Sequence, residues 1–304
     1  LFEDNAEFGY GMLLAQQAIR DGLKAKVEEV AANENATAEV KAACQEWLDT
    51  FSVGATNGAA TDKLVAALEN VDCPTCKDIV KNKDFLAKKS QWIFGGDGWA
   101  YDIGFNGVDH VLASGKDINI MVFNTEVYSN TGGQSSKATP TGAVAQFAAG
   151  GKEVKQKDLA AIAMSYGYVY VAQISMGADM NQTIKAIAEA EAYPGPSLII
   201  AYAPCINHGI KKGMAKAQTE EKLAVQSGYW NLFRFNPAAE GKKFSLDCKP
   251  ATVDYQEFIK GEVRYTSLAL KNPARAEKLF AKAEQNAKDK YAYLEKLVTL
   301  YDEK

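Results

Sequence analysis

Two short segments carry residues whose types and spacing suit the binding of a phosphorylated ligand. The first is Gly95-Gly96-Asp97-Gly98, which follows an apolar run and precedes a helical pattern. Glycines at such a turn let the backbone approach a ligand closely, and the N–H groups of a helix start suit a phosphate oxygen. Asp97 has the same sign of charge as phosphate, so it fits there only if a divalent cation lies between them. Mg²⁺ prefers oxygen donors and commonly bridges a carboxylate and phosphate oxygens.

The second segment is residues 124–133, NTEVYSNTGG, which follows another apolar run and is dense in hydroxyl, carboxylate and amide groups. In a doubly wound sheet, ligands bind outside the carboxyl ends of neighbouring strands. A lone Gly-Asp-Gly is usually a tight turn that binds nothing. Its pairing with an Asn-Thr loop, one strand–helix–strand unit later, favours a diphosphate–metal site.

The elements that must position these segments alternate between strands and helices. Continuous runs of Val, Ile, Tyr and Phe suit a sheet that is covered on both faces, and the alternation indicates right-handed crossovers. We therefore predict an α/β fold with a mostly parallel sheet and helices on both faces. The predicted strands are residues 91–94, 118–124, 168–174 and 197–202, and the predicted helices between them are residues 100–114, 157–166 and 180–192.

The region before residue 91 has the composition of helices. Ala, Glu, Lys and Gln dominate it, and apolar residues recur at helical spacing. Ser52–Thr61 is rich in Gly, Ala, Thr and Asn and predicts a loop. A short helix is expected to follow as far as Leu68, with Thr61 and Asp62 as its caps.

The region after about residue 224 changes character again. Residues 228–237, GYWNLFRFNP, predict an irregular aromatic stretch that packs against another part of the protein. Residues 268–300 predict a helical tail interrupted at Pro273. We predict a ligand-binding domain with its helical N-terminal segment at residues 1–225, and a helical C-terminal extension at residues 226–304.

Composition excludes several classes of protein. The 304 residues carry a net charge of −4, which gives no support for nucleic-acid binding, and no apolar run reaches the length of a membrane span. The five cysteines lack the spacing of a secreted disulfide framework, so reduced thiols and a cytoplasmic location are expected. The chain starts at LFEDNAEF without Met or a signal peptide, and we interpret it as a piece of a longer polypeptide.

The two ligand-binding segments together resemble a known motif. GDG, 25 intervening residues and then Asn is similar to the thiamine-diphosphate motif, which binds the diphosphate half of that cofactor. The longer strings FEDNAEFG, GGDGWAYDIG, NTEVYSNTGGQ and APCINHG, together with GYWNLFRFNP, resemble pyruvate:ferredoxin (flavodoxin) oxidoreductase along nearly the whole chain. The resemblance implies the diphosphate module of the thiamine-diphosphate-binding fold, late in a multidomain polypeptide.

The resemblance also implies a role for individual residues. Asp97, the Thr125 hydroxyl and the Val127 backbone carbonyl match the Mg²⁺ ligands of the family. Asn130 matches the residue that faces the substrate side of the thiazolium, so the resemblance implies a catalytic role for it. Cys205 matches a ligand of the 4Fe–4S cluster nearest the cofactor, with the other three ligands outside this chain. The implied cofactor-binding residues are Gly96, Asp97, Gly98, Trp99, Thr125, Glu126, Val127, Tyr128, Ser129 and Asn130.

What the resemblance implies about activity is an oxidative decarboxylation. The family converts pyruvate and CoA to acetyl-CoA and CO₂ and passes electrons through iron–sulfur clusters to ferredoxin or flavodoxin. It implies thiamine diphosphate, Mg²⁺ and a 4Fe–4S cluster as cofactors, and other domains of the same polypeptide and a second copy in a homodimer as partners. The residue that activates the pyrimidine lies in another domain, so this segment is not expected to be active alone.

Other functions remain open from the residues. A non-redox thiamine enzyme of the decarboxylase or transketolase kind shares the GDG and Asn motif but needs no cluster. A related 2-oxoacid could replace pyruvate as substrate. A nucleotide-binding or structural module could contain the same turn and bind no thiamine.

Three further residues have alternative interpretations. Cys73 and Cys76 form a Cys-Pro-Thr-Cys pair, which superficially suggests a redox or zinc half-site. No strand precedes the pair and no second pair exists for zinc, so we interpret it as structural or incidental, with a labile disulfide as the alternative. His208, three residues beyond Cys205, is either an ordinary loop residue or a hydrogen-bonding partner near the cofactor or cluster.

Overall fold

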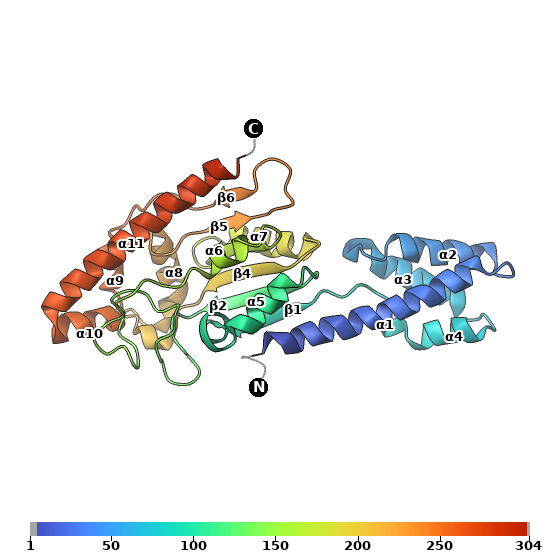
Figure 1. Cartoon of the computed structure of the whole chain (residues 1–304), viewed down its shortest axis with the longest axis horizontal. Helices are drawn as coiled ribbons and strands as arrows, with labels where there is room; N and C mark the ends of the chain where they lie inside the picture. The colour runs from blue at the N-terminus through green and yellow to red at the C-terminus, as the bar shows by residue number, and fades with distance from the viewer. Residues whose placement is uncertain (1–4, 303–304) are drawn as a thin grey trace. The chain divides into compact units, whose positions relative to one another are not determined.

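The computed structural model describes residues 5–302, and the chain divides into two compact units. Residues 8–91 form the smaller unit, and residues 92–302 with residues 5–7 form the larger one (Figure 1). Residues 1–4, in which the motif FEDNAEFG begins, lie outside the described residues. This division does not test the predicted domain boundary after residue 225, which stays a prediction.

The smaller unit is helical, as its composition predicted. Its helices pack around a core that includes Val27, Trp47, Leu64 and Ile79, all of which are fully buried. Burial of this apolar face, more than intrinsic propensity, stabilises helices of this length. The helices are α1 (Ala6–Ala32), α2 (Ala38–Asp49), α3 (Gly54–Leu68), α4 (Pro74–Lys81) and the short 3₁₀ helix η1 (Lys83–Phe85).

The predicted loop at Ser52–Thr61 is wrong, because α3 already begins at Gly54. Gly, Thr and Asn disfavour a helix by their intrinsic propensity, but here tertiary contacts outweigh it. The buried Asn57 side chain accepts hydrogen bonds from Arg20 Nη2 at 3.1 Å and from the Lys88 backbone N–H at 2.7 Å. The helix therefore starts about two turns before the caps that the sequence suggested.

The larger unit contains a six-stranded sheet in the order β1-β2-β4-β3-β5-β6. The first four strands in that order are parallel, and β5 and β6 add to the β3 edge in antiparallel pairing. The predicted α/β fold with a mostly parallel sheet is confirmed. The strands are β1 (Trp92–Gly96), β2 (Asn119–Asn124), β3 (Tyr170–Ile174), β4 (Ser197–Tyr202), β5 (Phe233–Phe235) and β6 (Phe244–Leu246).

Both faces of the central strands are buried, which explains their continuous apolar runs. Tyr170 and Ile199 pack with Ala186 of helix α7 on one face. The alternate residues, such as Val171 and Ile200, are equally buried on the opposite face. The helices of this part are α5 (Phe105–Ala113), α6 (Leu159–Met164), α7 (Met180–Ala192) and α8 (Ala217–Gln226), with short 3₁₀ turns η3 (Ile206–His208) and η4 (Met214–Lys216).

The helix predicted at residues 100–114 is broken in the structure. A π-helix, η2 (Gly98–Ile103), follows β1, and α5 begins only after Gly104. The Gly104 N–H donates to Trp99 O at 2.9 Å, which closes the wide turn. A Cβ at Gly104 would lie 2.4 Å from the Trp99 ring, so glycine is needed for this close approach.

The C-terminal region contributes both to the sheet and to the helices that cover it. The aromatic stretch at residues 228–237, predicted as irregular, contains β5, which pairs with β3 through Phe233 and Phe235. The predicted helical tail with its break at Pro273 is confirmed by α10 (Val263–Lys271) and α11 (Pro273–Leu300), which follow α9 (Tyr255–Ile259). None of the helices within residues 5–302 combines the length and the apolar character that a membrane span requires.

Candidate functional site

The site forms at the carboxyl ends of three neighbouring parallel strands. Asp97 follows β1, Thr125 follows β2, and Cys205 lies three residues beyond β4, the next strand in the sheet. Parallel strands end at the same edge of a sheet, so the residues that follow them face a common region. The sheet therefore brings together the two segments that the sequence paired.

Asp97 is a buried carboxylate whose partners are hydroxyl groups. It is 1% exposed, its Oδ1 accepts from Thr125 Oγ1 at 2.8 Å, and its Oδ2 accepts from Ser136 Oγ at 2.6 Å. Burial raises the pKa of Asp97 to about 6, against the opposing effect of those two hydrogen bonds. No ion pair within residues 5–302 joins Asp97 to a Lys, Arg or His side chain. A buried carboxylate without a positive partner is the group that a bound cation would compensate.

The three predicted Mg²⁺ ligands meet at one point. Thr125 Oγ1 lies 2.8 Å from Asp97 Oδ1 and 3.0 Å from the Val127 carbonyl oxygen. A carboxylate, a hydroxyl and a carbonyl oxygen are hard donors of the kind Mg²⁺ takes, and each has lone pairs left for a cation. The donor set therefore fits Mg²⁺. Within the described chain no group of three or more His, Cys, Asp or Glu side chains is arranged around a metal, and this set contains only one carboxylate.

A cavity of about 460 Å³ opens beside this point. Glycine allows two of its lining rings to pack closely on the backbone, since a Cβ at Gly98 would lie 2.4 Å from the Tyr128 ring and one at Gly95 would lie 2.2 Å from the Trp99 ring. Of the predicted cofactor-binding residues, Thr125, Glu126 and Val127 do not line it. Its lining residues are Gly96, Asp97, Gly98, Trp99, Ile103, Tyr128, Ser129, Asn130, Thr131, Gln134, Ser135 and Phe147.

Glu126 lies between two of the predicted metal ligands but directs its carboxylate into the protein interior. Its backbone has a φ of 61°, in the left-handed region that few non-glycine residues adopt. Its fully buried carboxylate accepts from Arg264 Nη2 at 2.7 Å, Tyr229 OH at 2.6 Å and Gln156 Nε2 at 2.9 Å. These bonds hold the strained residue in place, while Thr125 Oγ1 before it contacts Asp97 and the Val127 carbonyl oxygen after it contacts Thr125 Oγ1.

Arg264 also donates to a second buried carboxylate, that of Glu262, which lies near the loop that follows β4. Arg264 Nε donates to Glu262 Oε2 at 2.7 Å, and burial raises the pKa of Glu262 to about 7. His208 Nδ1 lies 3.7 Å from Glu262 Oε1, while His208 Nε2 donates to the Thr125 carbonyl oxygen at 2.7 Å. Burial lowers the pKa of His208 well below its ordinary value, so the ring is neutral. His208 therefore connects the loop after β4, which carries Cys205, to the loop after β2, which carries Thr125 and Val127 and is called the metal-ligand loop below.

Cys205, the predicted cluster ligand, lies in contact with this region. Its side chain is 8% exposed, and both the backbone N–H and the side-chain amide of Asn207 lie 3.5 Å from its sulfur. A Cβ at Gly133 would lie 2.8 Å from Asn207 Oδ1, so the two loops pack directly together. N–H donors to a thiolate are a common feature of iron–sulfur sites. One cysteine with two donors fits a single ligand position of such a cluster.

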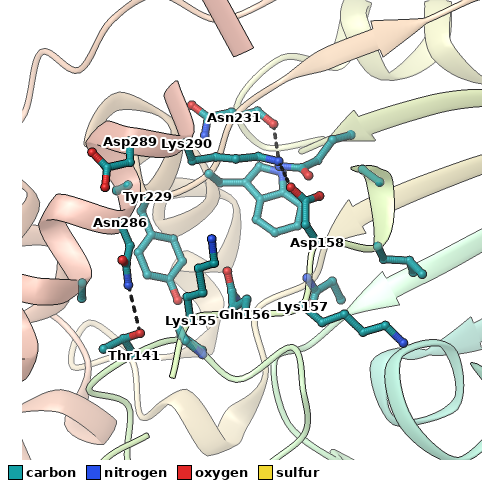
Figure 2. A pocket seen from close by; sticks show the side chains of 18 of the residues that line it. Thr141, Lys155, Gln156, Lys157, Asp158, Tyr229, Asn231, Asn286, Asp289 and Lys290 are labelled. Carbon is teal, nitrogen blue, oxygen red and sulfur yellow. Dashed lines mark hydrogen bonds and ion pairs between the residues drawn. The ribbon is translucent and has the colours of Figure 1, made fainter. Parts of the chain in front are cut away.

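A second cavity of about 430 Å³ is lined by Asn124 and by Gln156 and Tyr229, two of the residues that hydrogen-bond to the Glu126 carboxylate (Figure 2). Lys290 pairs with Asp158 (Figure 2). Lys157 donates to the Tyr101 carbonyl oxygen at 3.1 Å. Of the three lysines that line the cavity, only Lys290 is in an ion pair within the described residues, and we assign no ligand to this cavity.

Sequence reasoning missed the residues that support the site. Ser136, Gln156, Tyr229 and Arg264 all hydrogen-bond to Asp97 or Glu126. Ser136 and Gln156 lie in the irregular segment between β2 and α6, where periodicity gives no signal. The one available signal was an arginine among the apolar residues of a helix, at residue 264 of α10.

Comparison with known proteins agrees with this geometry. Residues 81–201 match the family described as "Thiamine pyrophosphate enzyme, C-terminal TPP binding domain". Over 98% of its length the chain is 52% identical to pyruvate-flavodoxin oxidoreductase of Klebsiella pneumoniae and 54% identical to pyruvate:ferredoxin oxidoreductase of Moorella thermoacetica. Over 94% of its length it is 46% identical to the mitochondrial NADP(+) pyruvate dehydrogenase of Euglena gracilis. The chain spans 26% of each of the first two relatives and 16% of the third.

Proposed function

Since the chain is similar along nearly its whole length to one segment of the pyruvate:ferredoxin (flavodoxin) oxidoreductases, we propose that it binds the diphosphate of thiamine diphosphate through one Mg²⁺. One observation carries the proposal. Asp97 Oδ1, Thr125 Oγ1 and the Val127 carbonyl oxygen converge, beside a cavity that Asp97 itself lines. Thiamine diphosphate, when bound, supplies a carbanion and electron sink for cleavage next to a carbonyl group.

In this proposal the residues of this chain hold the cofactors and set their orientation. Asp97, Thr125 and Val127 hold Mg²⁺, and the metal neutralises the diphosphate. Gly96, Gly98 and Trp99 line the diphosphate, with Tyr128 and Ser129 beside them. Asn130, which lines the cavity, faces the substrate. Cys205 supplies one thiolate to a 4Fe–4S cluster, and His208 fixes the distance between the loops that carry the two cofactors.

The whole enzyme then oxidatively decarboxylates pyruvate with CoA to acetyl-CoA and CO₂. Electrons leave through iron–sulfur clusters to ferredoxin or flavodoxin, and other domains of the polypeptide and a second copy complete the active site. A relative named for NADP(+) is 46% identical to this segment, so similarity over the segment alone does not choose the electron acceptor. A related 2-oxoacid as substrate, or a non-redox thiamine enzyme, is the alternative that activity assays distinguish.

The test is binding of thiamine diphosphate to the intact protein, with and without Mg²⁺, measured by calorimetry and by quenching of the tryptophan fluorescence to which Trp99 contributes. Asp97→Asn should weaken binding at least about 100-fold, which is about 2.7 kcal/mol. The stability of the cofactor-free variant should not fall, since the change removes an uncompensated buried charge. Glu153→Gln, in an exposed ion pair, is the matched control. Unchanged Mg²⁺-dependent binding in Asp97→Asn would refute the assignment.

A further inference from the structure

The Cys-Pro-Thr-Cys sequence of the smaller unit lies at the start of a helix. Cys73 is the N-cap of α4, Pro74 is its first residue, and Cys76 falls within its first turn. A proline at that position favours the helical backbone, and residues three apart lie on the same side of the turn. Both cysteines are free thiols. The helix start thus holds two sulfurs close together in the reduced state.

The two thiols differ in their access to solvent. Cys73 is partly exposed at the end of the helix, whereas Cys76 is 2% exposed and belongs to the core of the unit, together with Cys44 and Ile79. An external reagent therefore meets the sulfur of Cys73 first. Cys76 is shielded from solvent and is hydrogen-bonded to Cys73.

The pKa values of the two thiols differ as well: that of the exposed Cys73 is lowered and that of the buried Cys76 is raised. Hydrogen bonding from the backbone N–H and then the thiol of Cys76 lowers the pKa of Cys73. Burial and the bond to Cys73 raise the pKa of Cys76 to about 12. A helix N-terminus also stabilises a thiolate. The nearby Cys44 is fully buried, so an external reagent does not reach its sulfur directly, and burial raises its pKa to about 11.

We propose that Cys73 and Cys76 form a dithiol–disulfide redox site, in which the exposed Cys73 attacks low-molecular-weight disulfides and the buried Cys76 completes the exchange. The Cys73 thiolate attacks one sulfur of the external disulfide and releases its first thiol, which leaves a mixed disulfide. Cys76 then loses its proton and attacks the Cys73 sulfur, and the second external thiol leaves. Two electrons pass from the pair to the external disulfide, and its two halves take up two protons as thiols.

This assignment is independent of the thiamine site, because it uses residues of the smaller unit alone. It favours the labile disulfide, the alternative that the sequence left open, over a structural or incidental pair, an interpretation that rested on the absence of a preceding strand and of a second pair for zinc. The structure shows that a helix start supplies the arrangement without that strand. A metal site does not explain the pair, because no third His, Cys, Asp or Glu ligand joins it within residues 5–302.

The first test equilibrates the intact protein with mixtures of oxidised and reduced dithiothreitol, quenches with acid, alkylates the remaining thiols and digests with trypsin. Peptide 64–77 contains Cys73 and Cys76 and no other cysteine, and peptide 42–63 contains Cys44 alone. We expect peptide 64–77 to convert reversibly to an internally bridged form that lacks two hydrogen atoms, while peptide 42–63 stays alkylated. Alkylation of both cysteines of peptide 64–77 at every ratio would overturn the proposal.

The second test assigns the roles of the two sulfurs. At pH 7 the alkylation rate of Cys73 in the wild type should exceed that of Cys44 by at least about tenfold, and this measurement needs no variant. Cys76→Ser should accumulate a mixed disulfide with oxidised glutathione, because the resolving thiol is gone. Cys73→Ser keeps an N-cap side chain and should leave Cys76 unreactive. Equal rates for Cys73 and Cys44, or no trapped adduct in folded Cys76→Ser, would overturn the proposal.

Discussion

Replacing Arg264 by Met should loosen the metal-ligand loop more than any other single change of an arginine to an uncharged residue. The guanidinium is the only cation that contacts the fully buried carboxylates of Glu126 and Glu262 within the described residues. Removing one partner of a buried ion pair costs about 3–5 kcal/mol, because an uncompensated charge remains. Glu126 keeps its bonds from Tyr229 and Gln156, and Glu262 can take a proton near neutral pH, so we expect a loss of about 3 kcal/mol.

Native-state hydrogen exchange of the intact protein measures this loss locally. The amide of Tyr128, which donates to Gln134 O, and the amide of Val144, which donates to Arg264 O, report on the loop and its support. A loss of about 3 kcal/mol corresponds to exchange that is about 150-fold faster at these amides. The double variant Glu126→Gln with Arg264→Met should lose less, because the Glu126 charge that Arg264 compensates is removed together with the arginine.

Arg275→Met is the matched control, because Arg275 pairs with Glu153 at the surface. Exposed pairs contribute less than about 1 kcal/mol, so exchange at Tyr128 and Val144 should barely change. If Arg264→Met accelerates exchange no more than Arg275→Met does, the buried network does not hold the loop. The explanation given for the backbone conformation of Glu126 would then be wrong.

Three further predictions concern pH, the cavity and the smaller unit. The pKa of Glu262 is raised to about 7 in the folded state from 4.5, so the folded state binds this proton more tightly than the unfolded state does. The resulting stabilisation of the fold is full below about pH 4.5 and is lost as pH rises to about 7. Exchange protection of peptides around Glu262 should show that decline, and Glu262→Gln should lack it. Gly98→Ala should displace Tyr128 and abolish the rise in melting temperature caused by thiamine diphosphate with Mg²⁺, whereas Gly58→Ala, with open space around it, should not. Leu64→Ala should destabilise the smaller unit by about 3–5 kcal/mol, seen as faster exchange in α2 and α3, because its side chain is fully buried in that core.

The sequence predicted the elements that have a strong local signal. Ile199 and its neighbours form a continuous apolar run, and such a run marks a doubly covered strand without knowledge of its partners. The Gly-Asp-Gly turn and the Asn-Thr loop could be paired because one crossover separates them. The strand order could not be predicted in the same way, since nothing local shows that β4 lies between β2 and β3.

The misses share a physical cause, which is that long-range contacts outweigh local propensity. The start of α3 depends on the bond between Asn57 and Arg20, which lie 37 residues apart. The conformation of Glu126 depends on Arg264, 138 residues later. A window of ten or twenty residues contains no information about either partner. The three converging oxygens were predicted from a motif, whereas the residues that hold them in place were not.

The strand order has a consequence for synthesis of the protein on the ribosome. β4 is the last of the four parallel strands to be made, yet it lies between β2 and β3 and joins them. Until residue 202 has left the exit tunnel, β3 has no parallel partner and β2 pairs with β1 alone. The smaller unit, complete at residue 91, can fold long before that. The nascent chain should therefore bind chaperones most strongly in the interval after β3 has left the tunnel and before β4 has left it.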